Sequence, residues 1–237
     1  MFNNIIECRK YLLLQQLNDS FFPIGSYTQS YGLETYVQQN KIFDSQSFYQ
    51  YLIQNINFSF LYNELLAIKL AYGYAKDKAI NEILYLDQLI SATKPAYEIR
   101  QASIKLGSRL VKTITKLGIG FKNNSFSEYC QQVELNFIYG HHALAYGALC
   151  GSLDLPYEYS ILNFAYAQLS GMVNNGVKLI PLSQTVGQQL LYQLQPILID
   201  AINRLELLTI EDLGRSTPGF ELRSIQHEKL YSRLYMS

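Results

Sequence analysis

The chain has 237 residues, of which 49% are hydrophobic and 16% are charged. A chain of this length and composition can bury a core of its own, without the disulfides or metal ions that stabilise very small domains. The 19 basic and 19 acidic residues balance, which excludes a global field that would recruit nucleic acid or an anionic membrane.

Cysteine usage and the start of the chain indicate a reducing environment. Cys8, Cys130 and Cys150 are widely spaced and form no C-x-x-C pair, which argues against a disulfide framework and a zinc site. The first ten residues lack the basic and apolar regions of a signal peptide. No apolar run approaches the length of a membrane helix. We therefore expect a cytoplasmic protein.

Apolar residues recur with the helical period along almost the whole chain. The predicted helices span residues 10–18, 28–40, 46–75, 80–91, 95–117, 126–149, 156–179 and 182–208. No alternating apolar run indicates a strand. The sequence therefore predicts an all-α fold, with a single helical-bundle-like domain of roughly eight to ten helices over residues 1–215. Residues 216–237 have weaker periodicity and are predicted to form a C-terminal tail.

Several residues mark expected helix ends. Asp44 and Ser45 are candidate N-caps, and Gly118 is a candidate C-cap. Pro196 lies within an otherwise helical pattern and is predicted to kink or divide that helix.

The stretch FFPIGSYTQSYGLETYV, residues 21–37, has an unusually polar but uncharged middle. Pro23 and Gly25 predict a tight turn with Gly25 in the left-handed conformation. Ser26 and Gln29 have the spacing of a capping box. Capping leaves four hydroxyl-bearing residues without an explanation: Tyr27, Thr28, Ser30 and Tyr31. Two interpretations stay open, a surface that hydrogen-bonds to another protein and a buried polar hinge between the first two helices.

The sequence offers little for catalysis. It contains neither a phosphate-binding G-x-x-x-x-G-K-[ST] loop nor a G-x-S-x-G nucleophile elbow. His141 and His142 would point about 100 degrees apart on a helix, so they are predicted to be a surface or dimer-seam pair, with a metal site as the alternative. An enzyme would have to use His227, Glu228 and Arg233 in a pocket, but no nucleophile lies near them in sequence.

Four basic residues share one face of the predicted 95–117 helix, because they are spaced by four, three and four: Lys105, Arg109, Lys112 and Lys116. This face is interpreted as solvated, and the alternative is a patch for an acidic partner or a polyanion. The absence of interleaved aromatic residues makes nucleic-acid binding a minor possibility.

The tail is rich in the residue types that anchor protein interfaces. It carries Phe220, Arg223, Tyr231, Arg233 and Tyr235. Chain ends are ordered only when something ties them down. The tail is therefore predicted to order on a partner, and the alternative is that it docks back on its own domain.

Three segments together resemble the urease accessory protein UreF family. They are residues 21–37, VKLIPLSQTVGQQLL at 177–191, and STPGFELRSIQHEKLYSRLYMS at 216–237. The resemblance runs end to end. Many relatives have Ser-His where this chain has Thr28 and Gln29, so a nickel-binding histidine at that place is not expected here.

The resemblance implies an all-α, dimeric protein that is not an enzyme. UreF-like proteins join a second accessory protein, UreD (also called UreH), and the GTPase UreG on apo-urease. There they help to couple GTP hydrolysis by UreG to nickel delivery and to carbamylation of the active-site lysine. The resemblance implies no catalytic residue, no metal site and no tightly bound cofactor, with nickel at most in transient contact. The alternative function is a polyanion- or small-molecule-binding helical protein.

The resemblance, together with the composition of the three segments, gives a set of predicted partner-binding residues. They are Tyr27, Ser30, Tyr31, Glu34, Lys178, Gln184, Gln188, Arg223, Ser224, His227, Glu228, Tyr231, Arg233 and Leu234. Lys178 stands out because it lies at an expected helix end just ahead of Pro181. Its alternative role is that of a cation favoured by a helix C-terminus.

Overall fold

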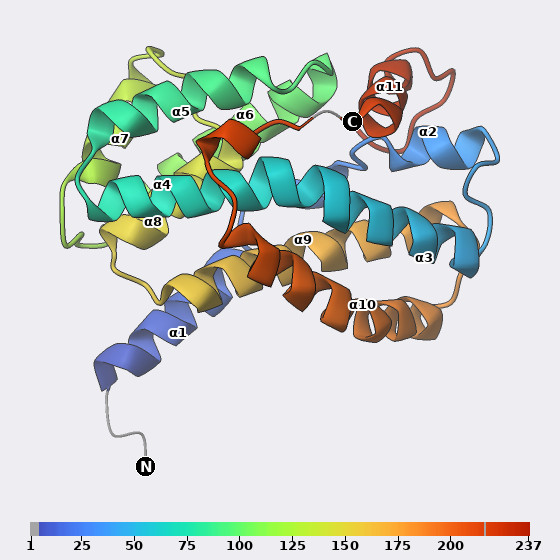
Figure 1. Ribbon diagram of the computed structural model, residues 1–237, viewed down its shortest axis with the longest axis horizontal. Coiled ribbons are helices and arrows are strands. Elements are labelled where there is room, and N and C mark those ends of the chain that lie inside the picture. Colours follow the sequence, from blue (N-terminus) through green and yellow to red (C-terminus); the bar gives the residue numbers. More distant parts are fainter. Residues whose placement is uncertain (1–4, 216) are drawn as a thin grey trace.

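The described part of the chain, residues 5–215 and 217–237 of a computed structural model, consists of helices and short connections and contains no strand. The helices are α1 (Ile5–Asn18), α2 (Leu33–Gln38), α3 (Ser45–Gln54), α4 (Leu66–Lys76), α5 (Ile80–Ala92), α6 (Tyr97–Leu117), α7 (Ser125–Glu134), α8 (His142–Ser152), α9 (Tyr157–Leu179), α10 (Gln184–Leu205) and α11 (Pro218–His227). The prediction of an all-α fold is confirmed (Figure 1).

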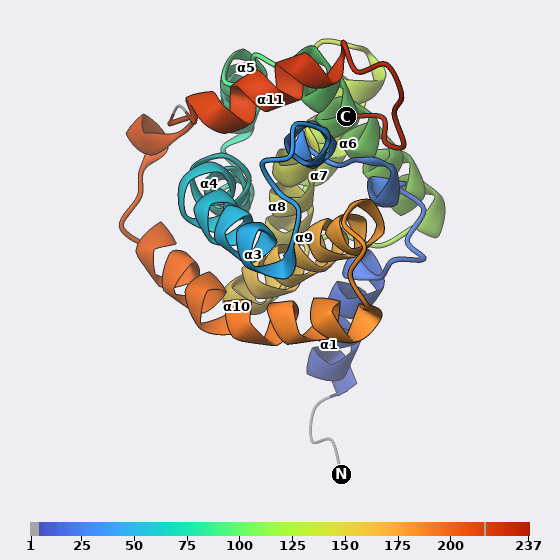
Figure 2. The same cartoon turned by 90° about the vertical axis from the view of Figure 1, so that its right-hand side faces the viewer.

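The centre of the fold is α8, in which every residue is buried. It packs most extensively against α4 and also contacts α6, and Figure 2 shows it near the middle of the molecule with other helices around it. Two glycines permit the close approach to α4. A Cβ on Gly147 would lie 2.6 Å from the carbonyl oxygen of Ile68, and one on Gly151 would lie 2.4 Å from that of Tyr72. Larger residues would push the two helices apart.

The helix predicted over 46–75 is confirmed as one continuous rod. It comprises α3, a π-helical stretch over Asn55–Leu65, and α4. The rod begins where the sequence indicated. Asp44 is the N-cap, and its Oδ1 accepts the backbone N–H of Ser47 at 2.8 Å, while the Ser47 hydroxyl reaches back to the backbone N–H of Asp44 at 3.1 Å. Such reciprocal bonds satisfy backbone donors that the first helical turn leaves free.

The prediction of a helix over 28–40 is wrong. A short 3₁₀ turn covers Ser26–Thr28, and α2 begins only at Leu33. Positive φ angles at Tyr31 (53°) and Gly32 (81°) interrupt the helical path between them. The capping box expected at Ser26 and Gln29 does not form, because the N-cap of the turn is Gly25, which has no side chain. Gly25 has the left-handed conformation that the sequence predicted.

The helix predicted over 126–149 is in fact two helices, α7 and α8. The turn between them contains Asn136 and Gly140 with positive φ angles of 58° and 78°. Asp87 in α5 holds this turn, because its carboxylate accepts the backbone N–H groups of Tyr139, Gly140 and His141 at 2.6, 3.0 and 3.2 Å. Burial raises the pKa of this carboxyl group. The periodicity of the sequence did not reveal the turn, since apolar residues continue through it.

Other helix ends agree more closely with the sequence. Gly118 ends α6 in the left-handed conformation, with φ 62°, as predicted. Pro196 lies inside α10, which continues through it without dividing. The first helix is longer than expected and starts at Ile5.

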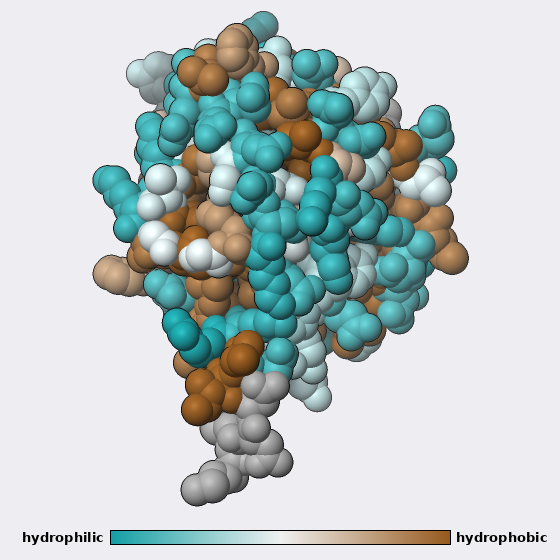
Figure 3. Space-filling model, turned by 90° about the vertical axis from the view of Figure 1, so that its left-hand side faces the viewer, coloured by the Kyte–Doolittle hydropathy of each residue, from teal (hydrophilic) through white to brown (hydrophobic). Residues whose placement is uncertain are grey.

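No helix among the described residues is both long and apolar enough to span a membrane. Figure 3 shows a mainly hydrophilic face, with apolar side chains gathered at its lower end beside the start of α1. Ile5, Ile6 and Leu12 in α1 are exposed by 75, 68 and 69%. The single chain therefore leaves apolar surface uncovered on this helix.

Candidate functional site

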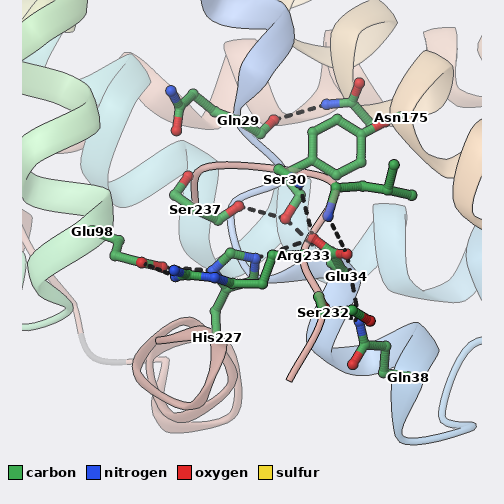
Figure 4. A network of polar contacts seen from close by, with 12 residues as sticks. Gln29, Ser30, Glu34, Gln38, Glu98, Asn175, His227, Ser232, Arg233 and Ser237 are labelled. Carbon is green, nitrogen blue, oxygen red and sulfur yellow. Dashed lines mark hydrogen bonds and ion pairs between the residues drawn. The ribbon is translucent and has the colours of Figure 1, made fainter. Parts of the chain in front are cut away.

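The buried carboxylate of Glu34 in α2 is the centre of a polar network that reaches the last residues of the chain (Figure 4). Its Oε1 accepts the backbone N–H of Leu234 at 2.8 Å, and its Oε2 accepts that of Tyr235 at 3.1 Å. Oε2 also lies 3.2 Å from His227 Nε2. Only 2% of Glu34 is exposed, and a charge buried to this extent needs such partners. The carboxylate therefore fixes the path of the last residues.

His227, the last residue of α11, joins Glu34 to a second carboxylate. It is fully buried, and its Nδ1 lies 2.5 Å from Oε2 of Glu98 in the first turn of α6. The other oxygen of Glu98 accepts a hydrogen bond from Arg233 Nη1 at 2.6 Å. We call Glu34, Glu98, His227 and Arg233 the clamp, because they join α2 and α6 to the C-terminal segment, residues 217–237.

The last residues of the chain also form hydrogen bonds with residues 26–31, which we call the polar run. The carbonyl oxygen of Ser237 accepts two hydrogen bonds from Ser30, from the backbone N–H at 2.8 Å and from Oγ at 2.5 Å. The backbone N–H of Met236 donates to the carbonyl oxygen of Thr28 at 2.9 Å. Part of the polar run therefore binds the C-terminal segment within the same chain.

Helix α11 lies against α2 at a glycine. Gly32 has a φ of 81°, and a Cβ there would lie 2.7 Å from Oγ of Ser224. On the next turn, the ring of Phe220 lies 6.0 Å from that of Tyr36 and 5.3 Å from that of Tyr51, between centroids. The side chains of α11 thus fill a prepared surface of the domain.

The C-terminal segment is accordingly ordered on its own domain. This is the arrangement that the alternative interpretation of the tail describes, and ordering of the segment on a partner stays a prediction. Residue 216, where the predicted tail begins, lies outside them. Partner binding by this segment remains a prediction.

The structure divides the predicted partner-binding residues into groups. In the clamp or directly beside it lie Ser30, Glu34, Ser224, His227 and Arg233. On the outer side of the C-terminal segment lie Glu228, Tyr231 and Leu234. Arg223 lies over the Tyr36 ring, 5.7 Å from its centroid. Lys178 is exposed in the last turn of α9, as its sequence position indicated.

The remaining four predicted residues line one groove. They are Tyr27, Tyr31, Gln184 and Gln188. The groove has a volume of about 500 Å³ and lies between the segment after α1 and the helices α9 and α10. Residues from the first two sequence motifs thus meet on its walls, although more than 150 positions separate them in the chain. The polar run therefore has both buried and surface roles, because Ser30 is buried and Tyr27 is 68% exposed.

Sequence reasoning missed Glu98 as part of the site. It lies close after Pro95 at the start of α6 and has the ordinary appearance of an acidic residue in a first helical turn. No signal in the sequence pairs it with His227 and Arg233, because these contacts form only when α6 lies beside the C-terminal segment.

The geometry does not support an enzyme built from His227, Glu228 and Arg233. His227 has both ring nitrogens occupied by carboxylates and is buried, while Glu228 is exposed. Among the described residues no group of three or more His, Cys, Asp or Glu side chains is placed to hold a metal ion.

The two adjacent histidines are buried, so the prediction of a surface pair is wrong. Burial lowers the pKa of His141 to about 3, with help from the positive charges of Lys94 and Arg100. It lowers the pKa of His142 to about 4. Both imidazoles are therefore neutral core residues.

The basic face of α6 is exposed, as its spacing predicted. Lys105, Arg109, Lys112 and Lys116 are all on the surface and form no ion pair with any residue that the structure describes. Arg109 is fixed by a hydrogen bond from Nη1 to the carbonyl oxygen of Ile24 at 2.8 Å. This arrangement suits the interpretation of a solvated face, and binding of an acidic partner stays untested.

The fold and the site together define an all-α protein whose polar centre holds a chain segment in place and whose surface presents that segment. The UreF family model matches residues 42–195. Over 226 residues the chain is 34% identical to the urease accessory protein UreF of Lachnoclostridium phytofermentans, covering 95% of this chain and 98% of the relative. It is 35% identical to that of Actinobacillus pleuropneumoniae serotype 5b (94% and 97% covered) and 30% identical to that of Ureaplasma parvum serovar 3 (94% and 95%).

The chain therefore belongs to the UreF family of urease accessory proteins. Its relatives are named as accessory proteins, so it is not itself an enzyme. The resemblance drawn from the three sequence motifs is confirmed.

Proposed function

We propose that this protein is a scaffold that assembles with UreD/UreH and the GTPase UreG on apo-urease, in the cytoplasm and as a homodimer. In that assembly it promotes nickel insertion and regulates GTP hydrolysis by UreG. Nickel is the cargo of the process and needs no resident site in this chain. The family membership supports the urease context, and the partners and the mechanism are part of the proposal.

One observation carries the proposal, namely the two-sided character of the C-terminal segment. Its inner side is fixed by the clamp and by burial of Tyr235 and Ser237. Its outer side exposes Tyr231, Leu234 and Met236, the first of them completely. A backbone that is already fixed lowers the entropic cost of ordering this segment when a partner binds. An exposed tyrosine on a rigid base suits an anchoring residue of an interface, and the aliphatic side chains beside it add apolar contact area.

The test is complex formation by the full chain with its UreD/UreH partner, measured by size-exclusion chromatography with light scattering. The variant Tyr231→Ala/Leu234→Ala removes the two exposed anchors without touching the clamp. The control Tyr85→Ala/Leu207→Ala removes a matched pair that is exposed by 56 and 83% on other elements. We expect the wild type and the control to capture the partner and the first variant to lose it.

Two results would contradict the proposal in different ways. Capture by the Tyr231/Leu234 variant at wild-type affinity would show that the partner uses another surface. Failure of the wild-type chain to bind UreD/UreH at all would contradict the scaffold function itself. An interface core of this kind typically loses more than tenfold in affinity when two anchors are truncated.

A further inference from the structure

The groove between the segment after α1 and helices α9 and α10 has an unusual chemical lining. Its walls are rich in side-chain amides and hydroxyls, including Gln15, Asn18, Gln168, Asn174, Gln184 and Gln188. Among the described residues that line it, Asp19 is the one charged residue, and none is a lysine or an arginine. His142, which also lines it, is neutral because burial lowers its pKa to about 4. The lining therefore carries one carboxylate and many amide groups, whose oxygen atoms accept hydrogen bonds and whose NH₂ groups donate them.

Two of these acceptors are buried and unsatisfied. Gln29 and Asn175, exposed by 6 and 3%, both line the groove. Oε1 of Gln29 and Oδ1 of Asn175 have no hydrogen-bond partner among the described residues. A buried acceptor without a donor destabilises the fold by about 1–3 kcal/mol. Each of these two oxygen atoms therefore lacks a hydrogen-bond donor.

The orientation of both amides is fixed by what their nitrogen atoms do. Nδ2 of Asn175 donates to the carbonyl oxygen of Gln29 at 2.7 Å (Figure 4). Nε2 of Gln29 donates to Oγ1 of Thr28 at 2.8 Å. Rotating either amide by half a turn would break the hydrogen bond that its nitrogen donates. The positions of the oxygen and the nitrogen in each amide are therefore fixed.

The carboxylate of Asp19, an exposed residue that lines the groove, has one oxygen engaged within the chain. Its Oδ1 accepts the backbone N–H of Phe21 at 2.7 Å, while Oδ2 makes no hydrogen bond with a described residue. Tyrosine side chains, among them Tyr27, Tyr31 and Tyr166, supply aromatic surface to the same groove. A carboxylate, amide oxygens and aromatic faces are the three groups that a planar cationic donor uses together.

From this lining we propose that the groove binds a guanidinium group. Guanidinium is planar, always charged, and carries five N–H donors and no acceptor. It can supply donors to amide oxygens and neutralise Asp19, and its faces stack on tyrosine rings. An ammonium group offers three donors and no stacking face, and an anion would be repelled by the carboxylate of Asp19.

The guanidinium could belong to a free guanidino compound or to an arginine side chain of a partner polypeptide. The chemistry of recognition is the same for both sources. Only the second source rests on the proposed function. The binding test therefore uses small probes and the isolated full chain, so that its failure leaves the assembly test with UreD/UreH unaffected.

The probe is Nα-acetyl-arginine amide, titrated by isothermal calorimetry and by amide chemical shifts. The matched control probe is Nα-acetyl-citrulline amide, which has nearly the same shape but is neutral, and Nα-acetyl-lysine amide tests the need for a planar group. We expect the citrulline and lysine probes to bind at least tenfold more weakly than arginine. Equal affinity for citrulline, equal affinity for lysine, or no arginine binding up to roughly 20 mM would overturn the proposal.

Two variants place the binding in the groove. Asp19→Asn keeps the bond to Phe21 but removes the charge, and should weaken arginine binding at least fivefold without changing the binding of citrulline. Asp77→Asn removes an exposed acid outside the groove and should change nothing. An unchanged affinity in Asp19→Asn would place the guanidinium elsewhere and sink the assignment.

Two further ligands identify the source. Agmatine represents a free guanidino compound, and a nine-residue glycine-serine peptide with a central arginine represents a polypeptide. Tighter binding of the peptide than of the single residue supports a partner side chain, because the groove then also contacts backbone. Tighter binding of agmatine supports a small ligand.

Discussion

Glu34 and His227 are separated by 193 positions in the chain and meet in its interior, with 3.2 Å between Oε2 and Nε2. Through this contact the first sequence motif, which supplies Glu34, and the third, which supplies His227, become one structural unit. The contact gives each of these two buried side chains one of the polar partners that its burial requires. The contact therefore accounts for one polar residue in each motif that is buried among apolar side chains.

The first prediction concerns Glu34→Gln. The amide keeps the size of the carboxylate but lacks its charge, and it presents an NH₂ group where one oxygen accepts backbone donors. Leaving a buried backbone donor without an acceptor typically destabilises by about 1–3 kcal/mol. We expect this loss in urea unfolding, together with faster hydrogen exchange of the amides of residues 228–237.

The matched control is Glu228→Gln, an exposed site in the next residue after His227. Its stability should lie within about 0.5 kcal/mol of the wild type. If Glu34→Gln left both stability and exchange unchanged, the clamp would not be what holds the C-terminal segment.

A second prediction separates backbone strain from packing at Gly32. Gly32 and Gly118 both have positive φ angles, 81° and 62°, but only Gly32 has a neighbour that a Cβ would strike. Gly118→Ala should therefore destabilise by the left-handed penalty alone, about 1 kcal/mol. Gly32→Ala should lose clearly more, because α11 must also move away from α2.

Urea unfolding of the two variants gives the comparison. Exchange of the α11 amides should rise in Gly32→Ala and stay unchanged in Gly118→Ala. Equal behaviour of the two variants would mean that Ser224 yields without disturbing α11.

Much of the fold follows from the sequence, because a helix of several turns leaves a repeated apolar pattern. The rod from Ser45 to Lys76, its cap at Asp44 and the end of α6 at Gly118 were all predicted. The turn between α7 and α8 was not, because it depends on Asp87, more than fifty positions away. Local patterns cannot show that a distant carboxylate stabilises a turn.

The candidate site was predicted in part for the same reason. Glu34, His227 and Arg233 carry the resemblance to UreF, so they were named, although as partner-binding residues. Glu98 belongs to no motif, and its role appears only when α6 is placed beside α11. The docking of the C-terminal segment was left open, because an end rich in tyrosine and arginine suits both a free and a docked state.

The third prediction contrasts the two sides of the C-terminal segment. Tyr231 is fully exposed, whereas Tyr235 is 9% exposed. Tyr231→Ala should leave the free energy of unfolding within about 0.5 kcal/mol of the wild type. Tyr235→Ala removes a buried ring and should destabilise by about 2 kcal/mol or more.

Binding to UreD/UreH provides the second readout. With the segment still docked, Tyr231→Ala should weaken binding although it leaves stability intact. A loss of stability in Tyr231→Ala would contradict the assignment of this side chain to the outer face.

The last prediction concerns acid stability and the buried pair His141 and His142. Their pKa values are about 3 and about 4 in the folded protein, because burial disfavours the imidazolium, against about 6.5 in the unfolded chain. Below pH 6.5 the unfolded state therefore binds more protons than the folded state. Folding stability should fall between pH 7 and pH 5, by about 2 kcal/mol for each histidine at pH 5.

Asp87 acts in the opposite direction. Its pKa is raised by burial, so the folded state gains a proton before the unfolded state does as the pH falls through this raised value. Protonation of Asp87 therefore opposes the loss that the two histidines cause. Urea unfolding at pH 7, 6 and 5 measures the slope, and His142→Phe removes one titrating group beside Phe164, whose ring lies 5.3 Å away. The dependence of the unfolding free energy on pH should fall by about half in this variant, whatever its absolute stability. An unchanged dependence would mean that His142 does not gain a proton on unfolding in this range.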